Sequence, residues 1–240
     1  YNFEDNVSVF LEKMTDSWLT PRGIMFSEGF ALFSAIKDTG ASVVLESGTA
    51  YGGSCEMMAV MNPDVQILTT DLHEMYQSES FSKKRLNKYK NVLCKTENSF
   101  DLFPKILSNP SVKNVFLFID GPKGYQALYL ANRLIKRFSE KIVSVAIHDV
   151  RYDSSVANEI RKQFKNCIFT DDPEGVFDKY REMVDSHMLE INKKITKETK
   201  SSLNKEDGLG YLQASLKESP RGFGMEQSYM IKLLLSILKI

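Results

Sequence analysis

Residues 43–54 read Val-Val-Leu-Glu-Ser-Gly-Thr-Ala-Tyr-Gly-Gly-Ser, an apolar run that leads into a turn with three glycines. Glycine adopts backbone conformations that other residues avoid, and it lets a ligand approach the main chain closely. Free N–H groups at the start of the following helix can hold an anion. The pattern predicts a buried strand, a ligand-binding turn and a helix that opens at Ser54.

An acidic residue stands at the distance expected of a nucleoside site. Asp71 ends a second apolar run, 19 positions beyond Gly52. In open α/β sheets this spacing places the carboxylate beside the first turn, where it can accept hydrogen bonds from ribose hydroxyls. The alternative is that the glycines only make a tight connection and that Asp71 caps its strand. The turn and the acid together favour a nucleoside ligand.

The rest of the chain alternates apolar runs with amphipathic segments, as expected of a parallel sheet with crossover helices. The predicted strands are Ser42–Leu45, Val65–Thr70, Asn91–Cys94, Val115–Ile119, Ile142–Ile147 and Cys167–Thr170. The predicted helices are Phe3–Trp18, Ser27–Asp38 with Ser27 as N-cap, Glu56–Met61, Ser80–Tyr89, Tyr125–Phe138 and Ser154–Phe164. Most strands are apolar throughout, which indicates burial on both faces of the sheet.

We expect one domain of four parts. N-terminal helices occupy 1–40, a cofactor-binding core 41–170 and a C-terminal strand or helix 221–240. The segment 171–220 is polar and rich in lysine. It is either a solvated helix and loop or an insertion that acts as a lid over the site.

Composition sets limits on partners and location. The formal net charge of the 240 residues is zero, so we expect no nucleic-acid partner. Three widely spaced cysteines, Cys55, Cys94 and Cys167, fit reduced thiols of a cytoplasmic protein. No stretch approaches the roughly 20 apolar residues of a membrane span. Because residue 1 is tyrosine, we expect a fragment or a processed form.

The glycine turn has the spacing E-x-G-x-x-x-G-x-S, formed by Glu46, Gly48, Gly52 and Ser54. A dinucleotide fingerprint requires G-x-G-x-x-G, and its middle position here is Ala50. The spacing resembles the first motif of class I S-adenosylmethionine-dependent methyltransferases. That resemblance implies a Rossmann-like, doubly wound, mostly parallel sheet of seven strands, with N-terminal helices and an insertion before the last strand.

The resemblance also implies cofactor contacts. Glu46 and the backbone of the turn would meet the amino-acid end of S-adenosylmethionine, and Asp71 its ribose. The segment 97–104 is similar to the family's G-D-S-x-x-x-L-P. Asn98 stands where the family usually has an Asp near the adenine. Asn98 therefore either contacts adenine or only caps a helix. The predicted cofactor-binding residues are Glu46, Gly48, Thr49, Ala50, Tyr51, Gly52, Ser54, Asp71, Asn98, Ser99 and Asp120.

A second group of candidates ends the fourth and fifth predicted strands. Asp120 opens a loop that contains Lys123, and His148 and Asp149 follow the fifth strand. The loop is similar to the I-D-G-x-H-x-Y segment of a broad bacterial methyltransferase group. It is also similar to that of catechol-type O-methyltransferases, in which a metal-binding Asp precedes a Lys by three positions. Metal-dependent members have an Asp-Asn pair where this chain has Asp149 and Val150, so one expected oxygen ligand is missing.

These residues predict O-methylation of a small hydroxylated molecule, such as a sugar or secondary metabolite. Magnesium held by Asp120 and Asp149 would lower the pKa of the hydroxyl, or Lys123 or His148 would act as general base. A simpler alternative is that the two aspartates only order loops. The family's Asn/Asp-Pro-Pro-Tyr/Phe segment, typical of nitrogen methylation, is absent, which favours oxygen as acceptor.

The sequence leaves two alternative functions and a possible homodimer undecided. The partial G-x-A-x-x-G allows an NAD-dependent oxidoreductase, although Ala50 and Glu46 argue against it. Replacement of the family Asp by Asn98 allows a non-catalytic S-adenosylmethionine-binding protein. The chain is also compatible with a homodimer.

Overall fold

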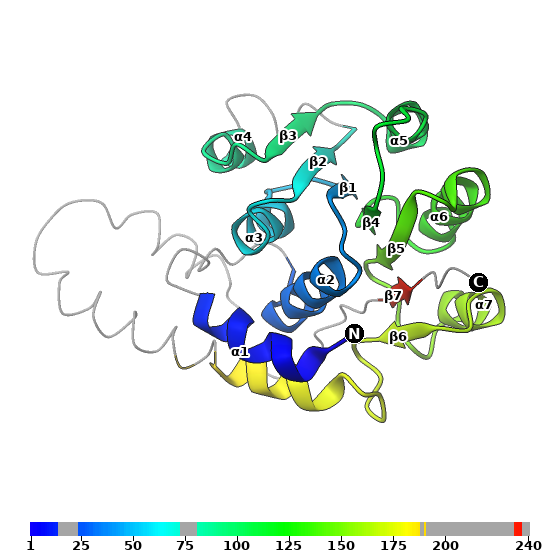
Figure 1. Cartoon of the computed structure of the whole chain (residues 1–240). Coiled ribbons are helices and arrows are strands. Elements are labelled where there is room, and N and C mark those ends of the chain that lie inside the picture. Colours follow the sequence, from blue (N-terminus) through cyan, green and yellow to red (C-terminus); the bar gives the residue numbers. More distant parts are fainter. Residues whose placement is uncertain (14–23, 73–80, 188–189, 191–232, 237–240) are drawn as a thin grey trace, which may run out of the picture.

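A computed structural model of the chain describes residues 1–13, 24–72, 81–187, 190 and 233–236. One sheet runs through the molecule with helices on both faces (Figure 1). Its strands are β1 Val43–Ser47, β2 Gln66–Thr70, β3 Val92–Lys95, β4 Val115–Ile119, β5 Ile142–Ile147, β6 Cys167–Phe169 and β7 Leu233–Ser236. The predicted doubly wound, mostly parallel α/β fold is confirmed.

The strand order across the sheet is β3-β2-β1-β4-β5-β7-β6. Strands β1 to β5 pair in parallel, and β7 runs antiparallel to both β5 and β6. The chain moves outward from β1 through β2 to β3, then returns to pair β4 with β1. The carboxyl ends of β1 and β4 therefore flank the point where the order reverses, which is where open α/β sheets bind ligands.

Each face of the sheet has its own layer of helices. The helices α1 Phe3–Lys13, α2 Phe26–Asp38, α3 Gly53–Met61 and α4 Phe81–Leu86 lie on one face, and α5 Ser99–Leu107, α6 Tyr125–Phe138 and α7 Ser155–Gln163 on the other (Figure 1). Strand β4 is buried along its whole length. Its Phe116 and Phe118 pack into the first layer and Leu117 and Ile119 into the second, so its side chains alternate between two cores.

Helix α2 begins differently from the prediction. Met25 occupies the N-cap position, and its N–H donates to the Glu28 carboxylate at 2.5 Å. Ser27, the predicted N-cap, instead lies in the first turn, where its N–H and hydroxyl donate to Asp185 at 3.1 and 3.0 Å. The Ser27 side chain therefore binds Asp185, which is distant in sequence, instead of capping its own helix as the local pattern predicted.

Other predicted boundaries also shift. Helix α1 ends at Lys13, and the predicted continuation over 14–18 lies outside the described residues. Helix α4 covers 81–86 only, because a turn in which the Tyr89 N–H donates to the Leu86 carbonyl follows it. Within 221–240 the described residues form strand β7, so the strand alternative is the one observed there.

The first part of the segment 171–220 packs against the N-terminal helices. Residues 178–187 form a helix beside α1 (Figure 1). Phe177 is fully buried, with its ring 5.1 Å from that of Phe3 and 5.8 Å from that of Phe30. The aromatic side chains of this part therefore complete the core over α1 and α2. Residues 191–220 lie outside the described residues, so the lid prediction for them stays a prediction.

Among the helices in the described part of the chain, none combines the length and apolar character needed to cross a membrane.

Candidate active site

The glycine turn and the loop after β4 are in direct contact. The N–H groups of Asp120 and Gly121 both donate to the Ser47 carbonyl at 2.8 Å, and the Gly48 N–H donates to the Thr70 carbonyl at 2.8 Å. Gly48 has φ +102°, and a Cβ there would lie 2.9 Å from the Gly121 nitrogen. Only glycine fits this position, because both its backbone conformation and the close approach of the loop exclude a side chain.

The turn continues into α3 through left-handed backbone. Ala50 has φ +42° and Gly52, the N-cap of α3, has φ +74°. Helix α3 begins at Gly53, one residue before the predicted start. The helix starts just after β1, so its first N–H groups lie at the carboxyl edge of the sheet. Among the described residues no side chain caps them, and free N–H groups at a helix start suit an anion.

The Asp71 carboxylate lies against the turn, as the spacing predicts. Its Oδ2 accepts a hydrogen bond from the Ala50 N–H at 3.0 Å, and its Oδ1 accepts one from the Leu72 N–H at 2.7 Å. Each carboxylate oxygen has two lone pairs, so acceptor capacity remains for a ligand hydroxyl.

Glu46 is buried beneath the same turn. Its Oε1 accepts a hydrogen bond from the Ser54 hydroxyl, and its Oε2 has no hydrogen-bond partner among the described residues. Burial raises the pKa of Glu46 to about 7, although the hydrogen bond from Ser54 opposes this. A buried carboxylate oxygen without a partner is costly, and it suits a cationic donor supplied by a ligand.

The segment before α5 completes this edge of the cofactor region. The Asn98 Oδ1 accepts a hydrogen bond from the Phe100 N–H at 2.9 Å and so caps α5. The Ser47 hydroxyl donates to the Ser99 hydroxyl at 2.8 Å, which ties α5 to the end of β1. The capping alternative for Asn98 is therefore observed, and its contact with adenine stays a prediction.

The second predicted group gathers at the ends of β4 and β5. His148 Nδ1 lies 2.6 Å from Asp120 Oδ1 and 3.0 Å from Asp149 Oδ1. Lys123 Nζ lies 2.5 Å from both Asp120 Oδ1 and Asp149 Oδ2, and 3.3 Å from His148 Nδ1. We call these four residues, Asp120, Lys123, His148 and Asp149, the charged cluster. It adjoins the glycine turn through the contact between Gly48 and the Asp120 backbone.

Residues 40–123 match a protein-family model described as "Putative methyltransferase". The matched segment contains the glycine turn, Asp71, the start of α5 and the loop from Asp120 to Lys123. The matched segment makes up about a third of the chain. No curated protein sequence matches the chain.

Several solved structures share part of this shape. A "putative caffeoyl-CoA O-methyltransferase" from Staphylococcus aureus is 13% identical over 98% of this chain and 99% of that one, with a TM-score of 0.48. An O-methyltransferase from Bacillus cereus in complex with SAH is 15% identical over 70% and 82%, with a TM-score of 0.49. TomG, an O-methyltransferase from Streptomyces achromogenes involved in tomaymycin synthesis and crystallised with SAM, is 14% identical over 98% and 90%, with a TM-score of 0.47.

In the charged cluster, ion pairs favour the charged forms of Asp120, Lys123 and Asp149. Burial would raise the pKa of Asp149, but hydrogen bonds with His148 and Lys123 outweigh it and hold that pKa well below its usual value. The pKa of Asp120 is lowered in the same way. Burial would lower the pKa of Lys123, but the two aspartates outweigh it and raise that pKa. Lys123 is therefore an ammonium at neutral pH. A lysine acts as a general base only if its pKa lies near neutrality, so Lys123 does not meet this condition in this arrangement.

The charged cluster does not fit a divalent ion in this arrangement. One ligand atom each from Asp120, His148 and Asp149 lies within 4.8 Å of the others, which is the spacing of a cation site. However, the Lys123 ammonium already contacts all three. The next residue, Val150, is apolar and buried, so it offers no further oxygen. The predicted magnesium site at Asp120 and Asp149 therefore lacks room for the ion while Lys123 remains in place.

Sequence reasoning missed one acidic residue beside the charged cluster. Glu28 of α2 is 3% exposed, and its Oε2 lies 3.9 Å from His148 Nε2. A carboxylate in a helix that is otherwise mostly apolar was the available signal, because such a group is rarely buried without a cationic or hydrogen-bonding neighbour.

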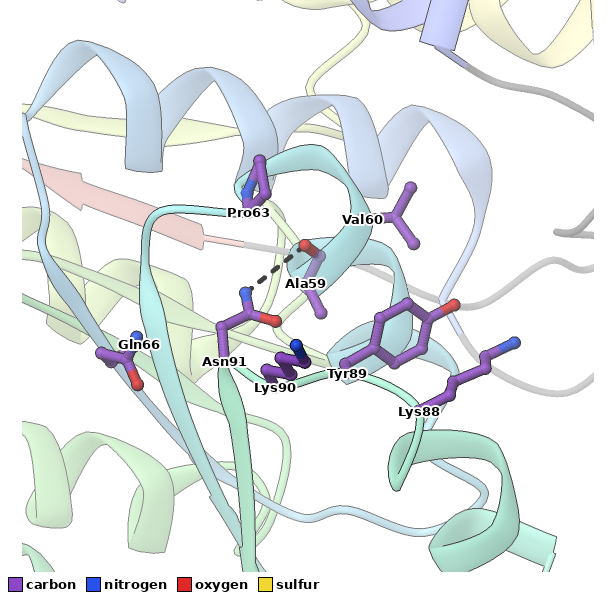
Figure 2. Close-up of a pocket in the computed structure, with 8 residues that line it drawn as sticks. All are labelled: Ala59, Val60, Pro63, Gln66, Lys88, Tyr89, Lys90 and Asn91. Carbon is purple, nitrogen blue, oxygen red and sulfur yellow. Dashed lines mark hydrogen bonds between the residues drawn. The ribbon is translucent and has the colours of Figure 1, made fainter.

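A hollow of about 490 Å³ opens at the opposite edge of the sheet, before β2 and β3. Its lining residues are Ala59, Val60, Pro63, Gln66, Lys88, Tyr89, Lys90 and Asn91 (Figure 2). The Asn91 amide donates to the carbonyls of Ala59, Asn62 and Val65 at 3.0 to 3.4 Å, and Lys88 pairs with Glu56 at 2.9 Å. These contacts serve the fold, and the hollow lies at the amino ends of the strands, away from the glycine turn.

Proposed function

We propose that the protein is a methyltransferase that binds S-adenosylmethionine at the glycine turn and transfers its methyl group to a hydroxyl of a small molecule. The observation that carries the proposal is the buried Glu46 carboxylate, whose Oε2 lacks a hydrogen-bond partner among the described residues. The ammonium of an amino-acid ligand would satisfy that oxygen. The uncapped start of α3 would hold the carboxylate of the same ligand.

The proposed nucleoside contacts follow from the same turn. The Asp71 carboxylate would accept hydrogen bonds from the ribose hydroxyls, since it already lies against the Ala50 N–H. Asn98 and Ser99 would lie toward the adenine. Gly48, Thr49, Tyr51 and Gly52 would contribute backbone and contact surface.

The charged cluster would act on the acceptor. The bound cofactor supplies an electrophilic methyl group on a sulfonium sulfur, which leaves as a neutral thioether. The Lys123 ammonium would stabilise negative charge that develops on the acceptor oxygen. The hydroxyl proton would pass to the pair formed by Asp120 and His148, whose Oδ1 and Nδ1 atoms lie 2.6 Å apart and can share it.

The finer assignments are part of the same proposal. A sugar or secondary metabolite is the acceptor class, the cysteine pattern favours a cytoplasmic protein, and a homodimer is compatible with the chain. The oxidoreductase alternative is disfavoured, because a methyltransferase model matches residues 40–123 and Ala50 stands where a dinucleotide turn needs glycine.

Calorimetry with S-adenosylmethionine, its demethylated product and NAD tests the proposal. We expect the first two to bind and NAD to show no heat. Glu46→Gln should weaken binding of S-adenosylmethionine by about 10- to 100-fold, the value of a charge-assisted hydrogen bond. Binding of NAD alone would reverse the assignment. Binding of S-adenosylmethionine without methylation of any hydroxylated acceptor in a broad panel would favour the non-catalytic alternative.

A further inference from the structure

The position of Lys123 within the charged cluster has a consequence for metal use. Its Nζ lies 2.5 Å from one oxygen of Asp120 and 2.5 Å from one oxygen of Asp149. It lies 3.3 Å from His148 Nδ1. These are the same three side chains whose ligand atoms could surround a single cation. The ammonium therefore occupies the place that a metal ion would take.

Charge balance explains why a cation is needed there. Asp120 and Asp149 are both partly buried, with side chains 20% and 30% exposed, and their carboxylates converge on one point. Two carboxylates at such a site repel one another unless a positive charge lies between them. Lys123 supplies that charge from the same loop as Asp120, three residues later. Because the lysine is part of the chain, its ammonium is available to the two aspartates at any concentration of free ions, although its side chain is 51% exposed.

The ammonium also keeps a second cation out. Magnesium binds carboxylate oxygens at about 2.1 Å and keeps its remaining positions filled with water or further oxygens. An ion at that distance from both aspartates would collide with Lys123 Nζ and be repelled by its charge. Val150 supplies no oxygen to compensate.

We infer that Lys123 replaces the divalent ion in this active site. The wild-type protein then takes up no divalent metal at the charged cluster, and removal of the ammonium opens a metal site formed by Asp120, His148 and Asp149. This inference rests on the proposed function for its catalytic meaning. Its test uses neither cofactor nor acceptor, so it can succeed or fail separately.

The experiment measures binding of Mn²⁺ alone to the full chain, by the loss of the free-ion electron paramagnetic resonance signal and by thermal melting. We expect the wild type to remove no Mn²⁺ from solution up to 1 mM, on the order of ten times the concentration at which an open carboxylate site fills. Lys123→Ala should bind one Mn²⁺ at least tenfold more tightly and should gain melting temperature when Mn²⁺ is added. Lys123→Gln provides a second neutral variant if the alanine variant does not fold.

Two controls locate the site. Lys165→Ala removes an exposed lysine between α7 and β6 and should behave as the wild type does. Adding Asp149→Ala to the Lys123 variant should abolish the gained binding. The inference is overturned if the wild type binds Mn²⁺ as tightly as the Lys123 variants, if those variants gain no binding, or if the gain survives loss of Asp149.

Discussion

The glycine turn and the charged cluster lie side by side at one edge of the sheet, but they are built by different means. The turn depends on backbone geometry, with Gly48 at φ +102° against the backbone of Gly121. The cluster depends on charge balance among side chains from two strand ends, with Lys123 between two aspartates. A change of shape should therefore disable the first region, and a change of charge the second.

Gly48→Ala should have the largest effect on stability, because this position requires a positive φ and leaves no room for a Cβ. The variant combines a backbone conformation that alanine avoids with a Cβ 2.9 Å from the Gly121 nitrogen. We expect a loss of about 4 kcal/mol in the free energy of unfolding, measured with urea. Gly40→Ala is the matched control, since Gly40 has φ +62° and its added Cβ would meet no atom of the described residues within 4 Å. It should lose only about 1 kcal/mol. Equal losses would show that the close approach to the loop is unimportant.

Glu46→Gln refines the comparison, because Glu46 is an ionisable residue buried beneath the glycine turn, where backbone geometry otherwise determines the structure. The pKa of Glu46 in the folded protein is about 7, raised from 4.5 by burial, so the folded state disfavours the charged form. This cost is absent below pH 4.5, grows as the pH rises toward 7 and is complete above 7. The glutamine variant should therefore be more stable than the wild type by about 3 kcal/mol at pH 8, and equally stable at pH 4.5.

Urea unfolding of the wild type and of Glu46→Gln at pH 4.5 and pH 8 checks this expectation. Glu97→Gln, which changes an exposed carboxylate near the same edge, serves as the control and should leave stability unchanged at both pH values. A stability difference that does not vary with pH would mean that Glu46 is already ionised and paired in the folded protein.

Asp71→Ala tests whether the acid beside the turn belongs to the ligand site or to the fold. Its hydrogen bonds from Ala50 and Leu72 are exposed, so we expect only a small change in unfolding free energy. Binding of S-adenosylmethionine, measured by calorimetry, should weaken by about 1–3 kcal/mol because charged hydrogen bonds to the ribose are lost. Unchanged affinity would reject the ribose assignment.

Asp149→Asn should destabilise the fold less than Gly48→Ala does, and its effect should depend on charge. The pKa of Asp149 is lowered in the folded protein. Its ion pairs therefore stabilise the fold fully above the ordinary carboxyl pKa of about 4, and this stabilisation is lost as the pH falls from about 4 toward the lower pKa of the folded state. The side chain is 30% exposed, so solvent screening limits the loss in the variant to about 1 kcal/mol at pH 7.

The corresponding measurement compares unfolding of the wild type and of Asp149→Asn at pH 7 and pH 3, with a smaller difference expected at pH 3. Asp153→Asn is the control: Arg151 also lowers the pKa of Asp153, but this ion pair is exposed to solvent, so its dependence on pH should be much smaller. A difference that increases toward pH 3 would contradict the charge balance inferred for the cluster.

Local pattern predicted much of the fold. Apolar runs placed six strands to within a few residues, and the spacing from Gly52 to Asp71 placed the acid against the turn. Such features depend on backbone conformation and on residues close in sequence, which composition and spacing record directly. The prediction for Ser27 was wrong for the opposite reason, since its partner Asp185 is 158 residues away.

Glycines, strand periodicity and the distance to an acid were enough to specify a parallel sheet with a nucleoside-type turn, because each acts through the local backbone. Three features appeared only after folding: Glu28 opposite His148, the partnerless oxygen of Glu46, and the ammonium of Lys123 between two aspartates. All three depend on which side chains from distant segments share a buried space. Burial and charge there are properties of the packed structure, because desolvation and ion pairing arise only when those segments come together.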